Sequence, residues 1–219
     1  MDKACLFVFA YGDVKHQTAT SVTAEITATP LLVHYVAPDA AIDRARAQAA
    51  TMFLLSVADV MVMVDRDIAF CHGDVAEIVR VARETKGICG GMVSKKANGL
   101  GWGTRLPDDS VGEIRTKQVI DMPKHSYVGG AFMAIHRDVF DAIAPTLTLM
   151  GAGGWFPFFE PMALENPAME NGLDHLSEDW SICHRAREAG CKVSTSMWPL
   201  TQHIGETSYS VFDGVPDVS

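Results

Sequence analysis

The stretch that decides the fold runs from Val60 to Asp67 and reads Val-Met-Val-Met-Val-Asp-Arg-Asp. Its first five residues form a continuous apolar run, which is typical of a strand buried on both faces of a parallel sheet. The two aspartates follow where that strand ends. Ligands of open α/β sheets bind at the carboxyl ends of the strands, so the sequence predicts a ligand site beside Asp65 and Asp67.

Strands and helices are predicted to alternate on both sides of this stretch. The apolar runs predict further strands over residues 4–10, 31–36 and 88–93, and helical periodicity predicts helices over 16–29, 42–57 and 74–86. The helix over 42–57 is expected to bury one stripe of side chains, made of Ile42, Ala45, Ala49, Met52, Phe53 and Val57. This alternation predicts an α/β fold with a Rossmann-like, mostly parallel central sheet flanked by helices.

The alternation stops after residue 95. A strand over 131–135, a helix over 137–144, a helix over 177–189 and a strand over 191–198 are still predicted, whereas the tail from Ser208 is expected to be irregular. The segment 151–172 is rich in Gly, Pro and Phe and is long for a structureless loop, which is typical of a lid or a binding loop.

Composition limits the possible functions. The chain has 219 residues, of which 48% are hydrophobic, and this is enough for one domain with a real core. The net charge of -9 and the lack of a basic tract disfavour a nucleic-acid partner. No apolar run reaches the roughly 20 residues of a membrane span, and no signal-peptide pattern is seen, so we expect a cytoplasmic chain. Five scattered cysteines without a CxxC pair predict reduced thiols.

Two groups of residues suggest metal chemistry. Asp65 and Asp67 stand one residue apart, and two such carboxylates can share a hard divalent cation that also binds phosphates. A polar strand end with a turn is the alternative. His203 follows the last predicted strand and is a candidate third ligand, although a single histidine is more often structural.

Other candidates lie near the predicted helix over 177–189. Glu178 and Asp179 stand in its first turn, where acidic residues either only complement the helix dipole or provide a general base. Gly129 and Gly130 precede a strand, as a tight turn or as a close approach to a substrate. Trp155 lies in the long loop, where its ring either packs internally or contacts a sugar. The Gly-rich run 99–105 is interpreted as a plain loop, because no clear helix follows it.

In their order and spacing, these segments resemble the GT-A glycosyltransferase fold, in its small family-2-like branch, over nearly the whole chain. The similar segments are the arginine-bearing helix (43–54), the DxD strand (62–70), the following strand and its lysine (90–96), the Gly-Gly strand (127–135), the ED helix (177–190) and the metal-histidine segment (202–205). The chain departs from the family at Arg46, which is followed by Ala47 where the family usually has Asn. We prefer Arg46 over Arg44 as the family's arginine.

The resemblance implies a single GT-A type domain over 1–219, with a nucleotide-sugar-binding half (1–95) and a smaller acceptor-side half (96–219). It implies transfer of a sugar from a nucleotide-diphosphate donor, with UDP-sugars favoured, to a hydroxyl of an unidentified glycan, lipid, protein or small molecule. Mn²⁺ or Mg²⁺ would be held by Asp67 and His203, and Asp65 would contact the metal or the ribose. Asp179 would be the base and Glu178 its orienting neighbour. Donor contacts would come from Ala10, Tyr11, Asp13, Arg46, Asp65, Arg66, Lys95, Gly129 and Gly130.

Two other functions would use the same aspartates. One is a sugar nucleotidyltransferase or a metal-dependent phosphohydrolase, and the other is an inactive nucleotide-sugar-binding protein. The lack of a Gly-rich loop after the first strand disfavours a nucleotidyltransferase.

Overall fold

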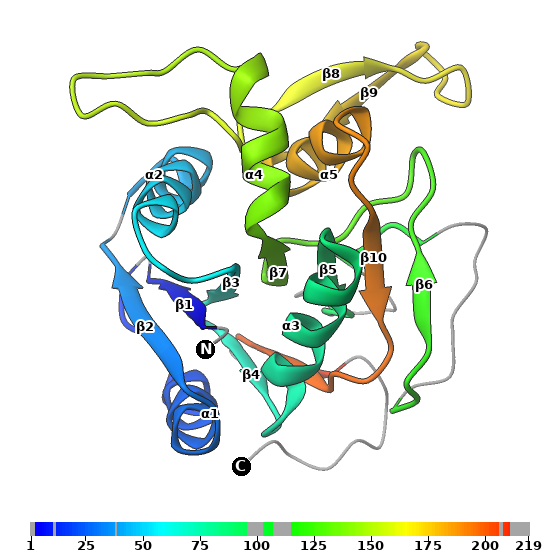
Figure 1. Ribbon diagram of the computed structural model, residues 1–219. Helices are drawn as coiled ribbons and strands as arrows, with labels where there is room; N and C mark the ends of the chain where they lie inside the picture. The colour runs from blue at the N-terminus through cyan, green and yellow to red at the C-terminus, as the bar shows by residue number, and fades with distance from the viewer. Residues whose placement is uncertain are drawn as a thin grey trace.

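A computed structural model of the chain describes residues 3–10, 12–37, 39–95, 103–106, 115–205 and 208–210. Its centre is a seven-stranded sheet with the strand order β2-β1-β3-β7-β5-β10-β6 (Figure 1). These strands are β1 (Ala4–Phe9), β2 (Leu31–Val36), β3 (Val60–Asp65), β5 (Ile88–Gly91), β6 (Val119–Asp121), β7 (Phe132–His136) and β10 (Val193–Ser196).

The sheet is mostly parallel, as the sequence predicts. Strand β1 pairs in parallel with β2 and β3, and β5 pairs in parallel with β10. Two strands run the other way: β7 lies antiparallel between β3 and β5, and β6 lies antiparallel to β10 at the edge. Because β1 and β3 run side by side, their carboxyl ends at Phe9 and Asp65 lie together.

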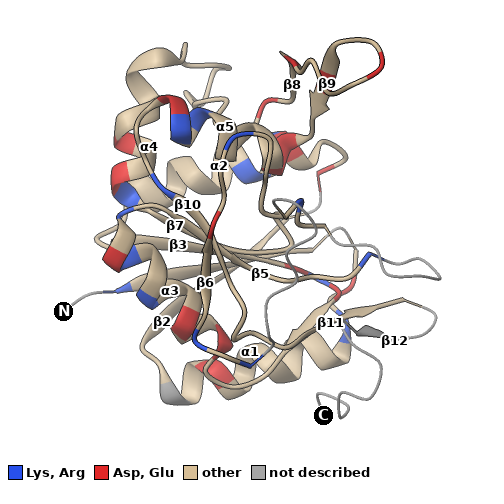
Figure 2. Cartoon of the chain, turned by 90° about the vertical axis from the view of Figure 1, so that its right-hand side faces the viewer, with Lys and Arg blue, Asp and Glu red and all other residues tan. Residues whose placement is uncertain are grey.

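Helices cover both faces of the sheet, and this explains the continuous apolar strands. The helices are α1 (His16–Ala28), α2 (Ile42–Leu54), α3 (Asp74–Thr85), α4 (Arg137–Ile143) and α5 (Glu178–Glu188), and a short 3₁₀ turn (Ala144–Thr146) follows α4. Side chains of β1 alternate between two clusters: Phe7 belongs to the cluster that includes residues of α2, α4 and α5, whereas Leu6 and Val8 belong to the cluster that includes residues of α1 and α3. Figure 2 shows the charged residues mainly on the helices, with the central strands almost entirely uncharged.

Two small sheets complete the described structure. A hairpin of β8 (Met162–Glu165) and β9 (Leu173–Leu176) lies within and after the segment predicted as a long loop, and Phe158 and Phe159 in that segment are fully buried. The other sheet has the order β12-β11-β4, from β4 (Ile68–Phe70), β11 (Thr201–Ile204) and β12 (Ser208–Ser210). The segment 151–172 is therefore not structureless, and the tail is regular over the three residues of β12.

Helix α2 differs from its prediction in a way that matters for the site. It ends at Leu54, and three residues of the predicted stripe, Ile42, Met52 and Val57, are 37%, 54% and 81% exposed. The other three residues of that stripe, Ala45, Ala49 and Phe53, are buried as predicted, and Arg46, Ala47 and Ala50 complete the buried face. The apolar periodicity missed Arg46 because partners far away in the sequence make its burial possible. Within the described residues, no helix has both the length and the apolar character that a membrane span requires.

Candidate active site

The Asp65–Arg66–Asp67 triplet is fixed between the ends of three strands. The backbone N–H of Asp65 donates to the carbonyl of Ala131 at 3.0 Å, and that of Arg66 donates to the carbonyl of Phe9 at 3.1 Å. The triplet borders a cleft of about 310 Å³ that is lined by Phe9, Asp39, Ala40, Ile42, Asp65, Arg66 and Asp67. The predicted ligand site at this sheet edge therefore coincides with a real concavity.

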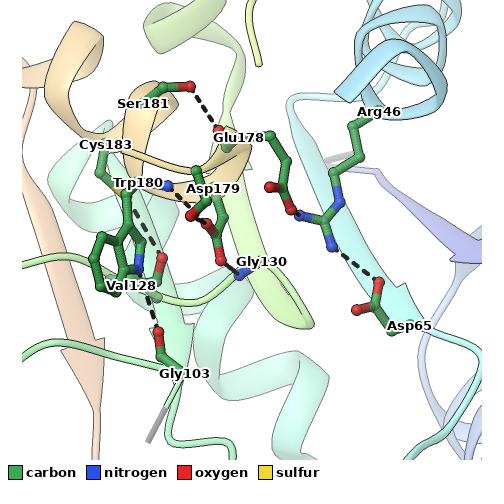
Figure 3. A network of polar contacts seen from close by, with 11 residues as sticks. Arg46, Asp65, Gly103, Val128, Gly130, Glu178, Asp179, Trp180, Ser181 and Cys183 are labelled. Atoms are coloured by element: carbon green, nitrogen blue, oxygen red, sulfur yellow. Dashed lines mark hydrogen bonds and ion pairs between the residues drawn. The ribbon is translucent and has the colours of Figure 1, made fainter. Parts of the chain in front are cut away.

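Arg46 lies at the centre of a group of carboxylates beside this cleft. One guanidinium nitrogen, Nη1, is 2.7 Å from Oε1 of Glu178, and the other, Nη2, is 3.0 Å from Oδ1 of Asp65 (Figure 3). The residue is only 2% exposed. Burial opposes the charge, but Asp65, Glu178 and Asp179 together raise the pKa of the guanidinium above its ordinary value. A buried charge of this kind is tolerated because its partners neutralise it.

Several interactions act in opposite directions on the pKa of the Glu178 carboxyl. Burial is the largest cause that raises the pKa of its carboxyl above the ordinary value; Arg46 acts against this, and the carboxylate of Asp179 adds to it. The side chain of Glu178 faces Arg46 rather than the opposite side of the helix, as Figure 3 shows. This residue is therefore suited to holding Arg46 in place.

Asp179 is held rigidly at the start of α5. Its Oδ2 accepts the backbone N–H of Gly130 at 2.9 Å, and its Oδ1 accepts the backbone N–H of Trp180 at 2.9 Å and the hydroxyl of Ser177. These donors keep the carboxylate in one orientation. Gly130 has room for no side chain, since an added Cβ would lie 2.2 Å from Nη1 of Arg46 and 2.9 Å from Cβ of Asp179. Gly130 thus approaches Arg46 and Asp179 closely, and the close approach to a substrate stays a prediction.

Strand pairing brings His203 beside the triplet. In the register of β11 with β4, His203 is opposite Ile68, and the Ile204 N–H donates to the carbonyl of Asp67 at 2.7 Å. As a result, Nε2 of His203 is 3.5 Å from Oδ1 of Asp67. The other ring nitrogen, Nδ1, is 2.8 Å from the carbonyl oxygen of Ser94. Because a carbonyl only accepts, Nδ1 is the donor in this contact, and Nε2 is the ring nitrogen that lies beside Asp67. Histidines that bind metals are commonly oriented in this way.

These residues fit a cation only in part. Among the described residues, no three His, Cys, Asp or Glu side chains are grouped so that they could hold a metal ion. Asp65 is engaged by Arg46 instead of joining Asp67 and His203. Magnesium-type sites, however, often take one or two carboxylates and complete the coordination with substrate phosphates and water. Asp67 and His203 have side chains of the types that could ligate a cation in such a site.

Of the remaining residues predicted to contact the donor, some lie near the cleft and others do not. Ala10 follows β1 and is half-buried, and Arg66 points from the triplet toward the carbonyl of Asp13, to which its Nη1 donates at 3.0 Å. Lys95 is exposed and is not part of the cleft lining, and Gly129 packs against the backbone of Gly103. Tyr11 lies outside the described residues.

The cleft also includes residues that the sequence reasoning missed. Phe9 ends β1, and Asp39, Ala40 and Ile42 follow β2 on the way into α2. The rule that ligands sit at the carboxyl ends of parallel strands would have pointed to all of them. Ser94, which orients His203, carries no comparable signal because its contribution is a backbone carbonyl.

Comparisons with known proteins give a fold but no family. No family model matches the sequence, and no curated protein is similar enough to count as a match. Among solved structures, the chain is similar to A197 from STIV, with a TM-score of 0.59 and 14% identity over 99% of this chain and 98% of that one. At this identity the likeness shows a shared fold alone.

A second solved structure, GalNAc-T7 with UDP, GalNAc and Mn²⁺, has a TM-score of 0.49 and 10% identity, over 93% of this chain and 44% of that one. This likeness is too weak to carry an argument about function.

Proposed function

We propose that this chain is a metal-dependent glycosyltransferase that transfers a sugar from a nucleotide-diphosphate sugar, with UDP-sugars as the first choice, to a hydroxyl acceptor. One observation carries the proposal: Nε2 of His203 lies 3.5 Å from the carboxylate of Asp67, which lines the cleft together with Asp65. The sequence resemblance to GT-A enzymes requires Asp67 and His203, which are far apart in the chain, to lie close together. A histidine remote from Asp67 would have removed the basis for the proposal.

The cleft is proposed to hold part of the donor. Its volume of about 310 Å³ lies at the lower end of the range for small-molecule sites, and it opens at the ends of β1 and β3. We assign the nucleotide base to the side of Phe9 and Ala10 and the diphosphate to the side of Asp67. Asp65, held by Arg46, is then the acceptor of a ribose hydroxyl.

Asp67 and His203 would hold the cation. When bound, Mn²⁺ or Mg²⁺ supplies positive charge that stabilises the leaving nucleotide diphosphate. The chain's own contribution is to orient these ligands: the Ser94 carbonyl fixes the imidazole, and the Ile204 N–H fixes the backbone of Asp67. Neither contact depends on the donor, so the ligands are preorganised.

Arg46 has a role different from a direct donor contact. Its guanidinium is enclosed and already shared between Asp65 and Glu178, so we interpret it as a positioning residue. It holds the Asp65 carboxylate toward the cleft. Its positive charge also offsets the repulsion between the neighbouring carboxylates of Glu178 and Asp179.

Asp179 is the proposed general base for an inverting transfer. Its carboxylate would accept the proton of the acceptor hydroxyl while that oxygen attacks the anomeric carbon and the bond from this carbon to the diphosphate breaks. The N–H of Gly130 keeps the carboxylate in one orientation during this step. Glu178 is the neighbour that locks Arg46 beside it.

The proposal is tested by incubating the chain with a panel of nucleotide sugars, with Mn²⁺ or with a chelator, and measuring released nucleotide diphosphate. We expect UDP release from at least one UDP-sugar, dependent on metal, and a thermal shift with the same donor. The Asp179→Asn variant should keep the donor affinity and lose about 100-fold or more in turnover. A sugar phosphate plus nucleotide as products would favour the nucleotidyltransferase or phosphohydrolase alternative. Tight donor binding without any turnover would favour an inactive binder.

A further inference from the structure

A second concavity lies close to the donor cleft, between the start of α2 and the loop that joins α4 to β8. Its volume is about 220 Å³, and it is lined by Ala41, Asp43, Arg44, Met150, Trp155, Pro157 and Glu160. Figure 1 shows this loop reaching across above α2. The donor cleft uses neighbouring residues of the same segment, Asp39, Ala40 and Ile42. The two concavities therefore share one short stretch of chain as a common wall.

The apolar side of this pocket is a structured hairpin. Met150 and Trp155 exchange two backbone hydrogen bonds, of 2.8 and 3.0 Å, and residues that face each other in this way put their side chains on the same face. The turn between them uses Gly151 and Gly154 at φ values of 68° and 60°, which disfavour other residues. A Cβ on Gly151 would lie 3.0 Å from the indole Nε1 of Trp155, so the indole rests against the turn. Met150 and Trp155 thus form a fixed platform.

The polar side of the pocket is also ordered. Arg44, in the first turn of α2, makes two hydrogen bonds of 2.7 and 2.6 Å to the carboxylate of Asp39. Asp43 precedes it on the helix, and Glu160 stands on the loop side. The pocket is therefore lined by one aromatic residue, two acidic residues and an arginine whose guanidinium is held by Asp39.

This combination favours a saccharide over the other acceptor classes. A sugar ring offers an apolar face of C–H groups, which packs on an aromatic ring, and hydroxyls, which bond to carboxylate and guanidinium groups. A lipid chain in this pocket would cover the exposed side chains of Arg44 and Glu160. Removing charged groups from water is costly even where an ion pair, such as Arg44 with Asp39, offsets part of the cost. The volume is below the roughly 300–1,000 Å³ of sites for larger ligands, so one ring fits better than an extended peptide.

We propose that this pocket binds one sugar ring of the acceptor, which makes the acceptor a glycan. The inference rests on the proposed glycosyltransferase function, because the pocket is assigned to the acceptor through its shared wall with the donor cleft. Trp155 and Met150 hold the ring, and Asp43, Arg44 and Glu160 select its hydroxyls.

The test measures saccharide binding without donor or metal, by saturation-transfer NMR and calorimetry. The probes are methyl glycosides of glucose, galactose, mannose and N-acetylglucosamine, with the disaccharides cellobiose, maltose and lactose. A short polyprenyl phosphate in detergent and a Ser/Thr-rich peptide represent the other acceptor classes. We expect at least one saccharide to bind, and neither of the other two probes.

Variants then locate the binding. Trp155→Ala should weaken saccharide affinity by about tenfold or more, through loss of ring packing, and Glu160→Gln, at an exposed residue, should weaken it less. Leu149→Ala is the matched control, because Leu149 is 55% exposed on the same hairpin and does not line the pocket. If Trp155→Ala lowers the melting temperature, Trp155→Phe and Glu160→Gln replace it as the informative variants.

Two failures can be told apart. Slow donor hydrolysis by water, measured without any saccharide, reports the proposed function alone. If hydrolysis is seen but no saccharide binds, or if the pocket variants bind as tightly as Leu149→Ala, the glycan subsite is wrong and the glycosyltransferase proposal stands. Binding of the polyprenyl phosphate or the peptide that depends on Trp155 would also overturn the subsite. If saccharides bind through Trp155 but no nucleotide sugar binds or reacts, the glycosyltransferase proposal fails, and the assignment of the pocket to an acceptor fails with it.

Discussion

Replacing Arg46 with methionine should separate a charge effect from a packing effect, because methionine fills much of the same space without the charge. Arg46 is only 2% exposed and is bonded to Asp65 and Glu178. Removing one partner of a buried ion pair typically costs about 3–5 kcal/mol, since the other partner remains buried and unpaired. The side chains of Asp65 and Glu178 keep 28% and 19% exposure, so solvent relieves part of this penalty. We therefore expect a loss near the lower end, about 3 kcal/mol.

The loss should also depend on pH in a defined direction. Burial raises the pKa of Glu178 above its ordinary value of 4.5, and Arg46 acts against that rise. Without Arg46, the pKa of Glu178 should rise further. A carboxyl with a raised folded-state pKa contributes stability below its ordinary pKa, and this contribution is lost as pH rises through the folded-state value. The deficit of Arg46→Met relative to wild type should therefore be smaller near pH 4.5, where only the loss of the Asp65 pair remains, and should grow as the pH rises.

The assay is urea unfolding followed by circular dichroism over this pH range. Arg44→Met is the matched control: it lies two residues earlier on α2, is exposed, and pairs with Asp39 at the surface. Surface ion pairs contribute little to stability, so this variant should stay close to wild type at every pH. Adding Glu178→Gln to Arg46→Met should recover part of the loss by removing an unpaired carboxylate. If Arg46→Met costs no more than Arg44→Met, or if its deficit does not change with pH, the reasoning about the buried charge is refuted.

Two further predictions concern the cation and the glycine turn. Asp67→Ala should abolish the part of donor affinity that depends on Mn²⁺, because it removes a proposed ligand beside His203; unchanged Mn²⁺-dependent affinity by calorimetry would contradict the metal role. Gly130→Ala should cost about 1–3 kcal/mol in unfolding free energy and should lower turnover, since its Cβ would displace both Arg46 and Asp179. Gly153→Ala is the control for the glycine change, because its Cβ would meet nothing within 4 Å, and equal effects of the two would rule out crowding as the cause.

The sequence predicted the fold best where apolar residues follow one another in a regular pattern along a single strand or helix. The run from Val60 to Val64 predicted a strand covered on both faces, and all five residues are fully buried. It did not reveal the direction of β7, because Phe132–Ile135 is buried on both faces in the same way whether its neighbours run parallel or antiparallel. Strand direction follows from how the chain connects across the sheet, which local periodicity does not record.

The site depended more on contacts distant in sequence. The residue types suggested Asp65, Asp67 and His203 as ligands of one cation, and the resemblance to a family supported that grouping, but neither gave the contact that brings them together. The pairing of β11 with β4 is the physical reason that His203 lies beside Asp67. Arg46 was missing from the predicted buried face of α2, because its partner Glu178 is 132 residues away. An arginine flanked by alanines on a buried helix face was the available signal, since such a charge is stable only with partners.

The same ion pairs connect the two sides of the proposed reaction. Arg46 binds Asp65, which borders the donor cleft, and Glu178, which precedes the proposed base on α5. Gly130 lies against both Arg46 and Asp179, and its N–H holds the base. A displacement of the guanidinium would therefore move the Asp65 carboxylate and disturb Asp179 at the same time. Arg46 has this effect without contacting the donor or the acceptor. Because one buried charge serves both carboxylates, donor orientation and proton acceptance are not independent properties of this site.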